Sequence, residues 1–410
     1  AGPFAREWFG RPDEALAVVG ITGTNGKTTV SYMVESIARA AGLDPGRIGT
    51  VGYAHGGREH AAPRTTPEAP DLFALLARMR DDGASLVALE VSSHALALGR
   101  VEGARFAVAA FLNLGRDHLD FHGDLEAYFE AKARMFDALR PPQIAVLSAD
   151  DPRGAVLARR TRTERISFGR APESDVRIED ERCRIDGSSA VLRTGGRRIE
   201  VRTPLPGRFH LENAAAAAAC CTALGVSDAA IVEGLASLAS VPGRTERIAA
   251  GQPFAVLVDF AHTEQALARL LDGAREIVDG RVLVVFGCGG ERDRGKRPLM
   301  GRAAAERADL VFLTSDNPRG EDPDAILGEI ESGVASVAGG LDRCRVIRDR
   351  AKAVAAAIFE ARPGDVVVVA GKGHETTQSF GDHVEHFDDR EVAASALAAS
   401  GWAGGCRARA

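Results

Sequence analysis

A glycine-rich segment near the start of the sequence has the residues of a phosphate-binding loop, namely Gly23, Thr24, Asn25, Gly26, Lys27, Thr28 and Thr29. Apolar residues 17–21 before it predict a buried strand, and residues 30–37 after it show helical spacing. In such a turn, backbone N–H groups surround an anion, a lysine reaches terminal phosphates and a hydroxyl binds Mg²⁺. Although Ile21 stands where the usual pattern has its first glycine, the segment predicts a nucleotide-binding site.

Two ionisable residues are candidates for a metal site beside Thr28. A metal ion neutralises the charge that develops on a transferred phosphoryl group, so a phosphate loop predicts nearby ligands. Glu90 follows an apolar strand predicted at residues 86–89, and His118 follows another at residues 106–111. Ligands bind at the carboxyl ends of such parallel strands. Glu90 taken alone could equally be a helix-capping or salt-bridged carboxylate.

A second set of polar residues follows predicted strands in the later part of the sequence. Asp316, Asn317 and Arg319 surround a proline, and a guanidinium there suits bidentate recognition of a carboxylate. Gly371 permits close approach of a ligand, and Glu375 could accept hydrogen bonds from an amine. For Arg319 alone, a surface salt bridge is the simpler interpretation. Together with the phosphate loop, these residues predict an ATP-dependent enzyme that activates a carboxylate and forms an amide.

The elements that must position these residues fall into two series. A length of 410 residues favours two domains, and abundant alanine and glycine suit helices packed closely on parallel sheets. In the first series, residues 48–53 predict a further strand and residues 166–201 a small antiparallel sheet. Strands of the second series are predicted at residues 255–259, 281–286, 310–314 and 366–370.

These elements predict an α/β fold. The first domain, residues 1–241, would hold a mostly parallel sheet with the small antiparallel sheet appended to it. A second α/β domain, residues 242–398, would begin after the turn near Pro242. Residues 399–410 are mostly small residues and arginines, and they predict a flexible tail.

Composition argues against several classes of partner. A net charge of −6 and a pI near 6.0 predict no binding of nucleic acid. No apolar run approaches the roughly 20 residues of a membrane helix, and residues 1–10 lack the layout of a signal peptide. The six cysteines have no metal-ligand spacing, which is typical of a reducing compartment. We therefore expect a cytoplasmic protein without a membrane span.

In combination, the motifs resemble those of the Mur ligases over roughly residues 16–397. The segments that carry the resemblance are residues 22–29, 90–94, 116–120, 243–246, 259–263, 289–300, 316–319 and 371–375. The resemblance implies a P-loop-type central ATP-binding domain and a Rossmann-like C-terminal domain that binds an amino acid. The implied reaction adds meso-2,6-diaminopimelate to UDP-N-acetylmuramoyl-L-alanyl-D-glutamate through an acyl phosphate, in peptidoglycan precursor synthesis.

The resemblance also implies roles for individual residues. The phosphate loop would bind ATP and Mg²⁺, Glu90 and His118 would each bind a metal ion, and Lys132 would be carbamylated and bind or position the second one. The catalytic residues would be Lys27, His118 and Lys132. Further contacts to ATP would come from Asn213, Arg244 and Asp259. The muramoyl dipeptide would be contacted by Thr65, Thr66, Ser92 and Arg100. Diaminopimelate would be contacted by Arg292, Asp316, Asn317, Arg319, Gly371 and Glu375, with Arg319 on its distal carboxylate.

Some alternatives stay open at this point. In the family, a domain that binds UDP precedes the phosphate loop, whereas in this sequence the loop begins near residue 22. Either the sequence is a fragment, or the UDP group is bound by something else. A folylpolyglutamate-synthase-like ligase has a related layout without that domain, but Arg319 argues against it. A non-catalytic nucleotide-binding scaffold is disfavoured by the intact Lys27, Glu90, His118 and Lys132. We expect a monomer whose partners are its small-molecule substrates.

Overall fold

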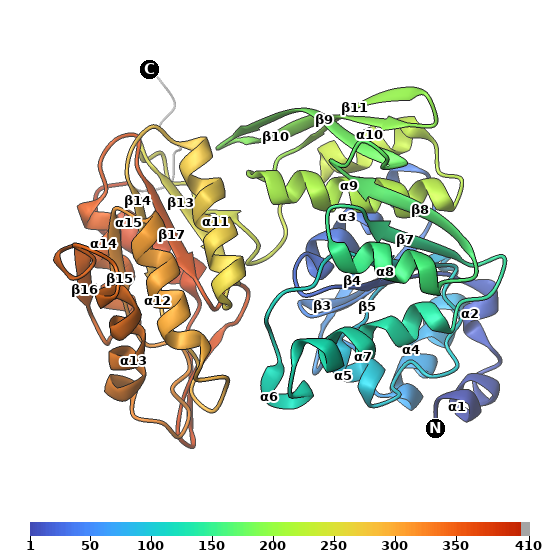
Figure 1. Ribbon diagram of the computed structural model, residues 1–410, viewed down its shortest axis with the longest axis horizontal. Coiled ribbons are helices and arrows are strands. Elements are labelled where there is room, and N and C mark those ends of the chain that lie inside the picture. The colour runs from blue at the N-terminus through green and yellow to red at the C-terminus, as the bar shows by residue number, and fades with distance from the viewer. Residues whose placement is uncertain (403–410) are drawn as a thin grey trace. The chain divides into compact units, whose positions relative to one another are not determined.

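The computed structural model describes residues 1–402, and the chain divides into two compact units. Unit 1 holds Ala1–Arg182, Gly187–Pro204 and Arg208–Ala239, and unit 2 holds the rest of the described chain. Figure 1 shows a sheet with helices packed against it in each unit. Of the tail that was predicted to be flexible, residues 403–410 lie outside the described part of the chain.

Unit 1 is built on an eleven-stranded sheet in the order β11-β10-β9-β8-β7-β6-β1-β5-β2-β3-β4. The central strand β1 (Ala17–Thr22) pairs in parallel with β5 (Leu86–Glu90) and β6 (Val108–Phe111), so that Ile21 lies beside Glu90. The loops after these three strands therefore leave the sheet at the same edge. The remaining strands are β2 (Pro45–Ile48), β3 (Gly52–His55), β4 (Arg58–Ala61), β7 (Ile144–Ser148), β8 (Glu164–Gly169), β9 (Val176–Arg184), β10 (Gly187–Thr194) and β11 (Arg197–Thr203).

Helices cover both faces of this sheet, as Figure 1 shows. One face carries α3 (Lys27–Ala40), α9 (Arg208–Ala223) and α10 (Asp228–Ser237), where the alanines of α9 permit close packing. The other carries α4 (Ala69–Asp81), α5 (Ser93–Ala97), α7 (Leu125–Asp137) and α8 (Pro152–Arg160). The fully buried rings of Phe73, Phe111, Phe129 and Phe136 belong to the core of this second face. Three short helices complete the unit, namely α1 (Gly2–Trp8), α2 (Pro12–Ala15) and α6 (Leu119–His122).

Unit 2 is built on a six-stranded sheet in the order β12-β13-β17-β14-β15-β16. Its strands pair in parallel except for β12, which is antiparallel to β13. The strands are β12 (Glu246–Arg247), β13 (Ala255–Asp259), β14 (Val282–Phe286), β15 (Leu310–Leu313), β16 (Cys344–Val346) and β17 (Val366–Ala370). Because β13, β14, β15 and β17 run in the same direction, the loops that follow them meet at one edge of the sheet.

The helices of unit 2 form two groups. The helices α14 (Arg350–Glu360) and α15 (Asp389–Ala399) pack on alternate strand residues such as Val256 and Val258, which face the same side. Since the strand interiors are buried on both faces, the second group covers the other side; it consists of α11 (Glu264–Ile277), α12 (Lys296–Arg307) and α13 (Pro323–Ala335). A 3₁₀ turn, η1 (Leu341–Arg343), and a hairpin of β18 (Thr377–Phe380) with β19 (His383–His386) complete the unit.

The predicted α/β fold is confirmed, with two differences in detail. An antiparallel pair, β10 and β11, is present near the predicted range, but it ends at Thr203 and it extends the main sheet. The single strand predicted at residues 48–53 is wrong, because β2 ends at Ile48, residues 49–51 form a turn, and β3 begins at Gly52, so that Ile48 pairs with Tyr53. At this turn Gly49 leaves no room for a side chain, since a Cβ would lie 2.1 Å from Glu90 Oε1.

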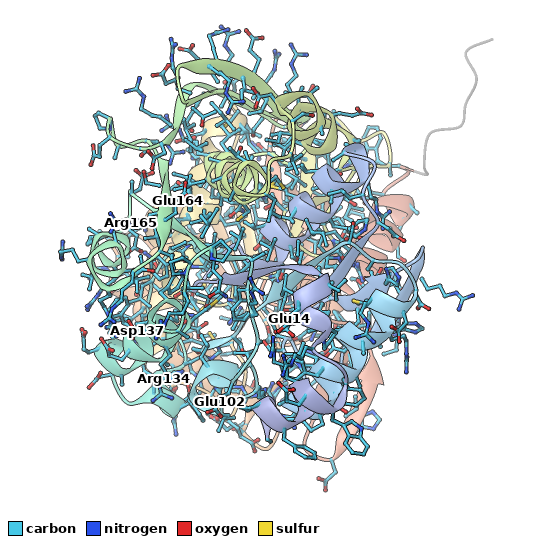
Figure 2. All side chains as sticks on the ribbon, turned by 90° about the vertical axis from the view of Figure 1, so that its right-hand side faces the viewer. Glu14, Glu102, Arg134, Asp137, Glu164 and Arg165 are labelled. Atoms are coloured by element: carbon cyan, nitrogen blue, oxygen red, sulfur yellow. The ribbon has the colours of Figure 1, made fainter. Side chains whose placement is uncertain are left out.

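Charged side chains lie on the surface of unit 1, and Figure 2 labels Arg134, Asp137 and Glu164 among them. All three are exposed, and Asp137 pairs with Arg160 across 2.5 Å. Surface pairs of this kind contribute little to stability. None of the helices within residues 1–402 is long and apolar enough to cross a membrane.

Candidate active site

The phosphate loop begins where β1 ends and leads into α3, as its sequence predicts. Gly26 caps the helix in a left-handed conformation (φ 91°), and a Cβ there would lie 2.4 Å from Asn213 Oδ1 on α9. Lys27 Nζ donates to the carbonyl oxygens of Gly23 (2.8 Å) and Thr24 (3.0 Å), which keeps the ammonium over the loop. The loop therefore joins a cation to a helix N-terminus, the combination that binds phosphate.

The loop after β6 holds the phosphate loop in place. Asn113 Oδ1 accepts a hydrogen bond from Asn25 N (2.9 Å), and its Nδ2 donates to the Asn25 carbonyl (3.1 Å). Thr24 Oγ1 accepts from Gly115 N (2.9 Å), while Thr29 is buried in the first turn of α3. Hydrogen bonds to both flanks of the loop thus keep its backbone in one conformation.

Glu90 is fully buried at the C-terminal end of β5, and three hydrogen bonds satisfy its carboxylate. Thr28 Oγ1 and Thr50 Oγ1 both donate to Oε2 at 3.0 Å, and Thr50 N donates to Oε1 at 2.9 Å. Burial of a carboxylate lowers the stability of the folded protein unless it is hydrogen-bonded or paired with a cation, so these three donors are required to offset the burial of Glu90. The structure therefore brings together two of the predicted metal ligands, Thr28 and Glu90.

The four residues predicted to contact the dipeptide lie around the same strand end. Thr66 Oγ1 donates to the Glu90 carbonyl (2.8 Å) and accepts from Ser92 N (3.1 Å). Thr65 Oγ1 lies 3.0 Å from Thr50 Oγ1, which donates to Glu90 Oε2. Arg100 Nη1 donates to the Thr66 carbonyl (3.5 Å). Hydroxyl groups and one guanidinium thus gather beside the carboxylate.

Lys132 is buried on α7, and its side chain contacts the phosphate loop. Its Nζ donates to the Gly23 carbonyl (3.0 Å), which also accepts from Lys27, and it lies 4.4 Å from the centroid of the Tyr128 ring. Burial lowers the pKa of Lys132 well below its ordinary value, and the nearby Lys27 ammonium lowers it further. The side chain is therefore disposed to be a neutral amine, which is the nucleophilic form.

His118 occupies a strained position after β6. It has a left-handed φ of 54°, which is uncommon for a residue with a side chain and is found disproportionately at functional sites. Its backbone N–H donates to Asp117 Oδ1 (2.9 Å), and its Nε2 lies 3.4 Å from Asp117 Oδ2. Its ring packs edge-on against His94, with 4.7 Å between the centroids. His118 and Lys132 thus make contacts of their own, separate from the hydrogen bonds between Thr28 and Glu90.

A magnesium ion fits the donors around Glu90. Carboxylate and hydroxyl oxygens are hard ligands, and Mg²⁺ in nucleotide enzymes is held by one or two carboxylates together with substrate phosphates. Within residues 1–402 no cluster of three or more His, Cys, Asp or Glu side chains could hold a metal ion by itself. A metal site at Glu90 and Thr28 would therefore depend on a bound nucleotide.

In unit 2, loops after β14, β15 and β17 carry the residues predicted to bind an amino acid. Asn317 Nδ2 donates to Glu375 Oε2 (2.9 Å). Gly371 leaves β17 with a φ of 113°, and a Cβ there would lie 2.7 Å from Asp316 Oδ2. The fold therefore brings these four predicted residues together from two separate loops.

Arg319 completes this cluster with a second strained backbone, at φ 53°. Its N–H donates to the Ser379 carbonyl (3.0 Å), and its Nη1 donates to the Gly290 carbonyl (2.6 Å). A Cβ on Gly289 would lie 2.9 Å from Arg319 Nη1 and 3.8 Å from Arg292 Cγ, so both arginines flank one glycine. Burial lowers the pKa of Arg319, and Arg292 lowers it further. Two neighbouring cations, one of them partly desolvated, favour binding of an anion.

The predicted ATP contacts of unit 2 are close to each other, with Arg244 before β12 and Asp259 at the end of β13. Asp259 accepts hydrogen bonds from Thr245 N (2.6 Å), Thr245 Oγ1 (3.0 Å) and Ala261 N (2.8 Å). Burial raises the pKa of Asp259, and the nearby Arg244 opposes that shift. The Arg244 guanidinium lies 4.5 Å from the centroid of the Phe260 ring, a cation–π contact.

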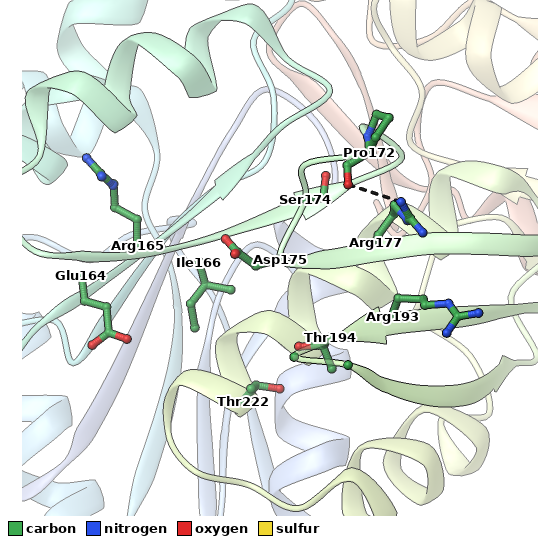
Figure 3. Close-up of a pocket in the computed structure, with 12 residues that line it drawn as sticks. Glu164, Arg165, Ile166, Pro172, Ser174, Asp175, Arg177, Arg193, Thr194 and Thr222 are labelled. Carbon is green, nitrogen blue, oxygen red and sulfur yellow. Dashed lines mark hydrogen bonds between the residues drawn. The ribbon is translucent and has the colours of Figure 1, made fainter.

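A pocket of about 440 Å³ lies elsewhere in unit 1, over the strands that extend the sheet (Figure 3). It is lined by residues of β8 to β10 and their turns, together with Thr222 of α9. Arg177 Nη1 donates to the Pro172 carbonyl (3.3 Å) and Arg193 Nε to Glu179 (2.8 Å), so both arginines are already engaged. No predicted site residue lines this pocket, and we do not assign it to the active site.

Several residues that complete these clusters were missed by sequence analysis. Thr50 lies in the segment predicted as a strand, although its hydroxyl and N–H both bind Glu90. Tyr128 OH lies 3.2 Å from Thr24 Oγ1, and its spacing of one helical turn from Lys132 could have indicated it. Lys372 lies within a recognised motif, but nothing in the pattern indicated that it is buried.

Two family domains match most of the chain. Residues 21–221 match the Mur ligase middle domain, and residues 243–373 match the Mur ligase, glutamate ligase domain. The chain belongs to the Mur ligase family. The resemblance inferred from its motifs is therefore confirmed.

Relatives of this Mur ligase have a common name. A protein of Solibacter usitatus named UDP-N-acetylmuramoyl-L-alanyl-D-glutamate--2,6-diaminopimelate ligase is 47% identical over 401 residues, covering 97% of this chain and 80% of the relative. A protein of Streptomyces coelicolor with the same name is 44% identical over 400 residues, covering 97% and 79%. A solved structure of a ligase of that name has a TM-score of 0.69 at 34% identity and covers 98% of this chain and 82% of its own.

The fold of this Mur ligase also matches Mycobacterium tuberculosis folylpolyglutamate synthase. The TM-score is 0.73 at 19% identity, covering 90% of this chain and 91% of the other. At that identity the likeness concerns the fold alone. Fold likeness does not by itself imply a shared substrate.

The burial of Lys132 predicts a pH-dependent stability. Because its pKa is lowered in the folded state, the unfolded chain binds a proton that the folded chain does not, so stability should rise with pH towards the ordinary value of 10.5. Lys132→Met removes that difference, and we expect higher stability at pH 7 with a flatter rise to pH 9, measured by urea denaturation. Lys352→Met, at a lysine with 78% side-chain exposure, is the control. The same pH dependence in Lys132→Met as in wild type would contradict the expectation.

Proposed function

We propose that this Mur ligase uses ATP to join meso-2,6-diaminopimelate to UDP-N-acetylmuramoyl-L-alanyl-D-glutamate, a step of peptidoglycan precursor synthesis. The observation that carries the proposal is the identity of 47% over 97% of the chain to a relative named as a 2,6-diaminopimelate ligase. The two clusters at the strand ends support it, because one suits a nucleotide and the other an amino acid with an extra carboxylate.

We further propose that residues 1–241 form the central ATP-binding domain and residues 242–398 the C-terminal amino-acid-binding domain. The phosphate loop would hold the ATP phosphates, and Asn213, Arg244 and Asp259 would make further contacts to ATP. Mg²⁺ held by Thr28 and Glu90 would supply charge neutralisation at the transferred phosphoryl group. The Lys27 ammonium, which lies over the loop, would bind the same phosphates.

Lys132 would carry a carbamate in the active enzyme. A neutral amine attacks CO₂, forms a C–N bond and releases a proton, and burial favours that neutral form. The product is an anion with two oxygens in place of the neutral amine, and it would lie near the Lys27 ammonium at Gly23. We propose that this anion, together with His118, binds or positions a second metal ion.

The dipeptide and the amino acid would bind to different residues. Thr65, Thr66, Ser92 and Arg100 would contact the muramoyl dipeptide. Diaminopimelate would be contacted by Arg292, Asp316, Asn317, Arg319, Gly371 and Glu375. The Arg319 guanidinium would pair with the carboxylate that lysine lacks, which would select diaminopimelate over lysine.

The proposed reaction consists of two displacements, a phosphoryl transfer followed by an acyl transfer. An oxygen of the glutamate γ-carboxylate attacks the γ-phosphorus of ATP, the bond between that phosphorus and the bridging oxygen breaks, and ADP leaves. The amine of diaminopimelate then attacks the acyl carbon, the tetrahedral intermediate expels phosphate, and the nitrogen loses a proton. The cations at the phosphate loop stabilise the charge that develops in the first displacement.

We propose that the protein works in the cytoplasm as a monomer, where its nucleotide-linked substrate is soluble. Folylpolyglutamate synthesis is the alternative activity that shares the fold. The likeness to folylpolyglutamate synthase is 19% identity, compared with 42–47% for the diaminopimelate ligases, which favours the latter.

A ligation assay tests this function. The protein is given ATP, Mg²⁺ and UDP-N-acetylmuramoyl-L-alanyl-D-glutamate with either meso-diaminopimelate or L-lysine, and phosphate release and product mass are followed. We expect the tripeptide product with diaminopimelate, one phosphate per product, and little product with lysine. Absence of the diaminopimelate product, or product with lysine alone, would contradict the proposal.

The carbamate predicts chemical rescue at Lys132. Lys132→Ala should lower turnover by roughly a hundredfold or more, because the carbamate that would bind or position the second metal ion is lost, and with it the stabilisation of the transferred phosphoryl group. Added acetate or formate should restore part of the activity by supplying a carboxylate in the vacated space. Lys352→Ala, an exposed lysine, should behave as wild type. Full activity of Lys132→Ala without added carboxylate would end the carbamate hypothesis.

The selective role of Arg319 predicts a loss that is confined to the amino acid. Arg319→Ala should cost about 2–5 kcal/mol in kcat/KM for diaminopimelate, as for a desolvated charge pair, and leave the KM for ATP unchanged. Arg302→Ala, at an arginine with 64% side-chain exposure in the same unit, is the matched control. Unchanged kinetics with diaminopimelate would remove Arg319 from the site.

A further inference from the structure

Lys372 is a fully buried cation in the amino-acid cluster of unit 2. It follows Gly371 directly after β17, and its side chain has no exposed area. Its Nζ lies within hydrogen-bond distance of the Thr377 carbonyl (2.6 Å), Glu375 Oε2 (3.2 Å) and Asn317 Oδ1 (3.3 Å). An ammonium has three N–H donors, and these acceptors use all of them. Lys372 therefore acts on its neighbours rather than on a bound substrate.

The contacts of Lys372 determine which way the Asn317 amide faces. Asn317 Oδ1 accepts from Lys372 Nζ and from Ser379 N (3.1 Å). Both groups can only donate, so the amide nitrogen cannot occupy that position. The Asn317 Nδ2 group is therefore directed at Glu375 Oε2, at 2.9 Å. Without Lys372, the main charged donor that favours this orientation would be lost.

The same cation also fixes Glu375, which lies on the open side of the cluster. The Glu375 side chain is 36% exposed, whereas the Lys372 side chain behind it is completely enclosed. Lys372 Nζ and Asn317 Nδ2 both donate to Oε2, so they set the rotation of the carboxylate without using Oε1. Charge-assisted hydrogen bonds of this kind are directional and roughly twice as strong as neutral ones.

We propose that Lys372 is a positioning residue that sets the specificity of this site for an amino acid with a second ammonium group. It would do so by holding Glu375 in the orientation that accepts that ammonium and by holding Asn317 beside it. This inference rests on the proposed function and deepens it. Because Lys372 lies behind the two side chains, its loss should weaken recognition of the amino acid and leave the use of ATP intact.

Steady-state kinetics of Lys372→Met test the inference. We expect the KM for meso-diaminopimelate to rise about ten- to a hundredfold, while the KM for ATP and turnover at saturating amino acid change little. The second probe is L-2-aminopimelate, which keeps the reacting amine and both carboxylates but lacks the second ammonium. Wild type should prefer diaminopimelate to this probe, and Lys372→Met should lose most of the preference. Lys352→Met is the control for substituting a lysine in unit 2.

An unchanged KM for diaminopimelate, or a preserved preference over L-2-aminopimelate, would overturn the role of Lys372. If Lys372→Met does not fold, Lys372→Gln is measured in the same way, and failure of both to fold would assign Lys372 to stability alone and overturn the proposal. Wild-type activity is measured in parallel. If wild type shows no activity, the proposed function and this inference are both contradicted. If wild type is active and the Lys372 variants behave in the same way, only the role of Lys372 is contradicted.

Discussion

The organisation of the nucleotide site depends on how one buried carboxylate is kept satisfied. Glu90 is enclosed at the end of a central strand, where an unpaired charge would be strongly destabilising. Its partners come from two other segments, because Thr28 lies in the first turn of α3 and Thr50 lies in the turn between β2 and β3. One side chain therefore fixes the phosphate-loop helix against the sheet edge. The same oxygens are suited to a magnesium ion once a nucleotide brings phosphate to the loop.

In unit 2, a buried cation stabilises the strand ends from which the loops of the amino-acid cluster begin. Arg350 is fully buried and pairs with Asp389 through two hydrogen bonds of 2.7 Å. Its guanidinium also donates to the carbonyl oxygens of Ala370 (2.9 Å), at the end of β17, and of Ser315 (3.4 Å), two residues after β15. Breaking a buried pair of this kind is strongly destabilising, since it leaves an uncompensated charge. The loops that carry the amino-acid cluster are thus anchored at their starting points.

The sequence predicted the features that depend on local order. Continuous apolar runs indicated the central strands, and the phosphate loop could be recognised because its residues are contiguous. The turn at Thr50 was missed because it depends on Glu90, which lies far along the chain. The left-handed backbone of Arg319 was equally hidden, since it is held by hydrogen bonds to the β18–β19 hairpin. Local patterns cannot show which distant partner a residue will meet.

Binding of a non-hydrolysable ATP analogue with and without Mg²⁺ tests the role of Glu90, on which the nucleotide site depends, most directly. Calorimetric titration of wild type and Glu90→Gln gives the affinity gained from the metal ion in each protein. We expect Mg²⁺ to lower the Kd of the analogue for wild type. In Glu90→Gln, we expect this Mg²⁺-dependent decrease in Kd to be about ten- to a hundredfold smaller. Affinity without Mg²⁺ should change little, because glutamine still accepts a hydrogen bond from Thr28. An equal effect of Mg²⁺ on both proteins would contradict a metal site at Glu90.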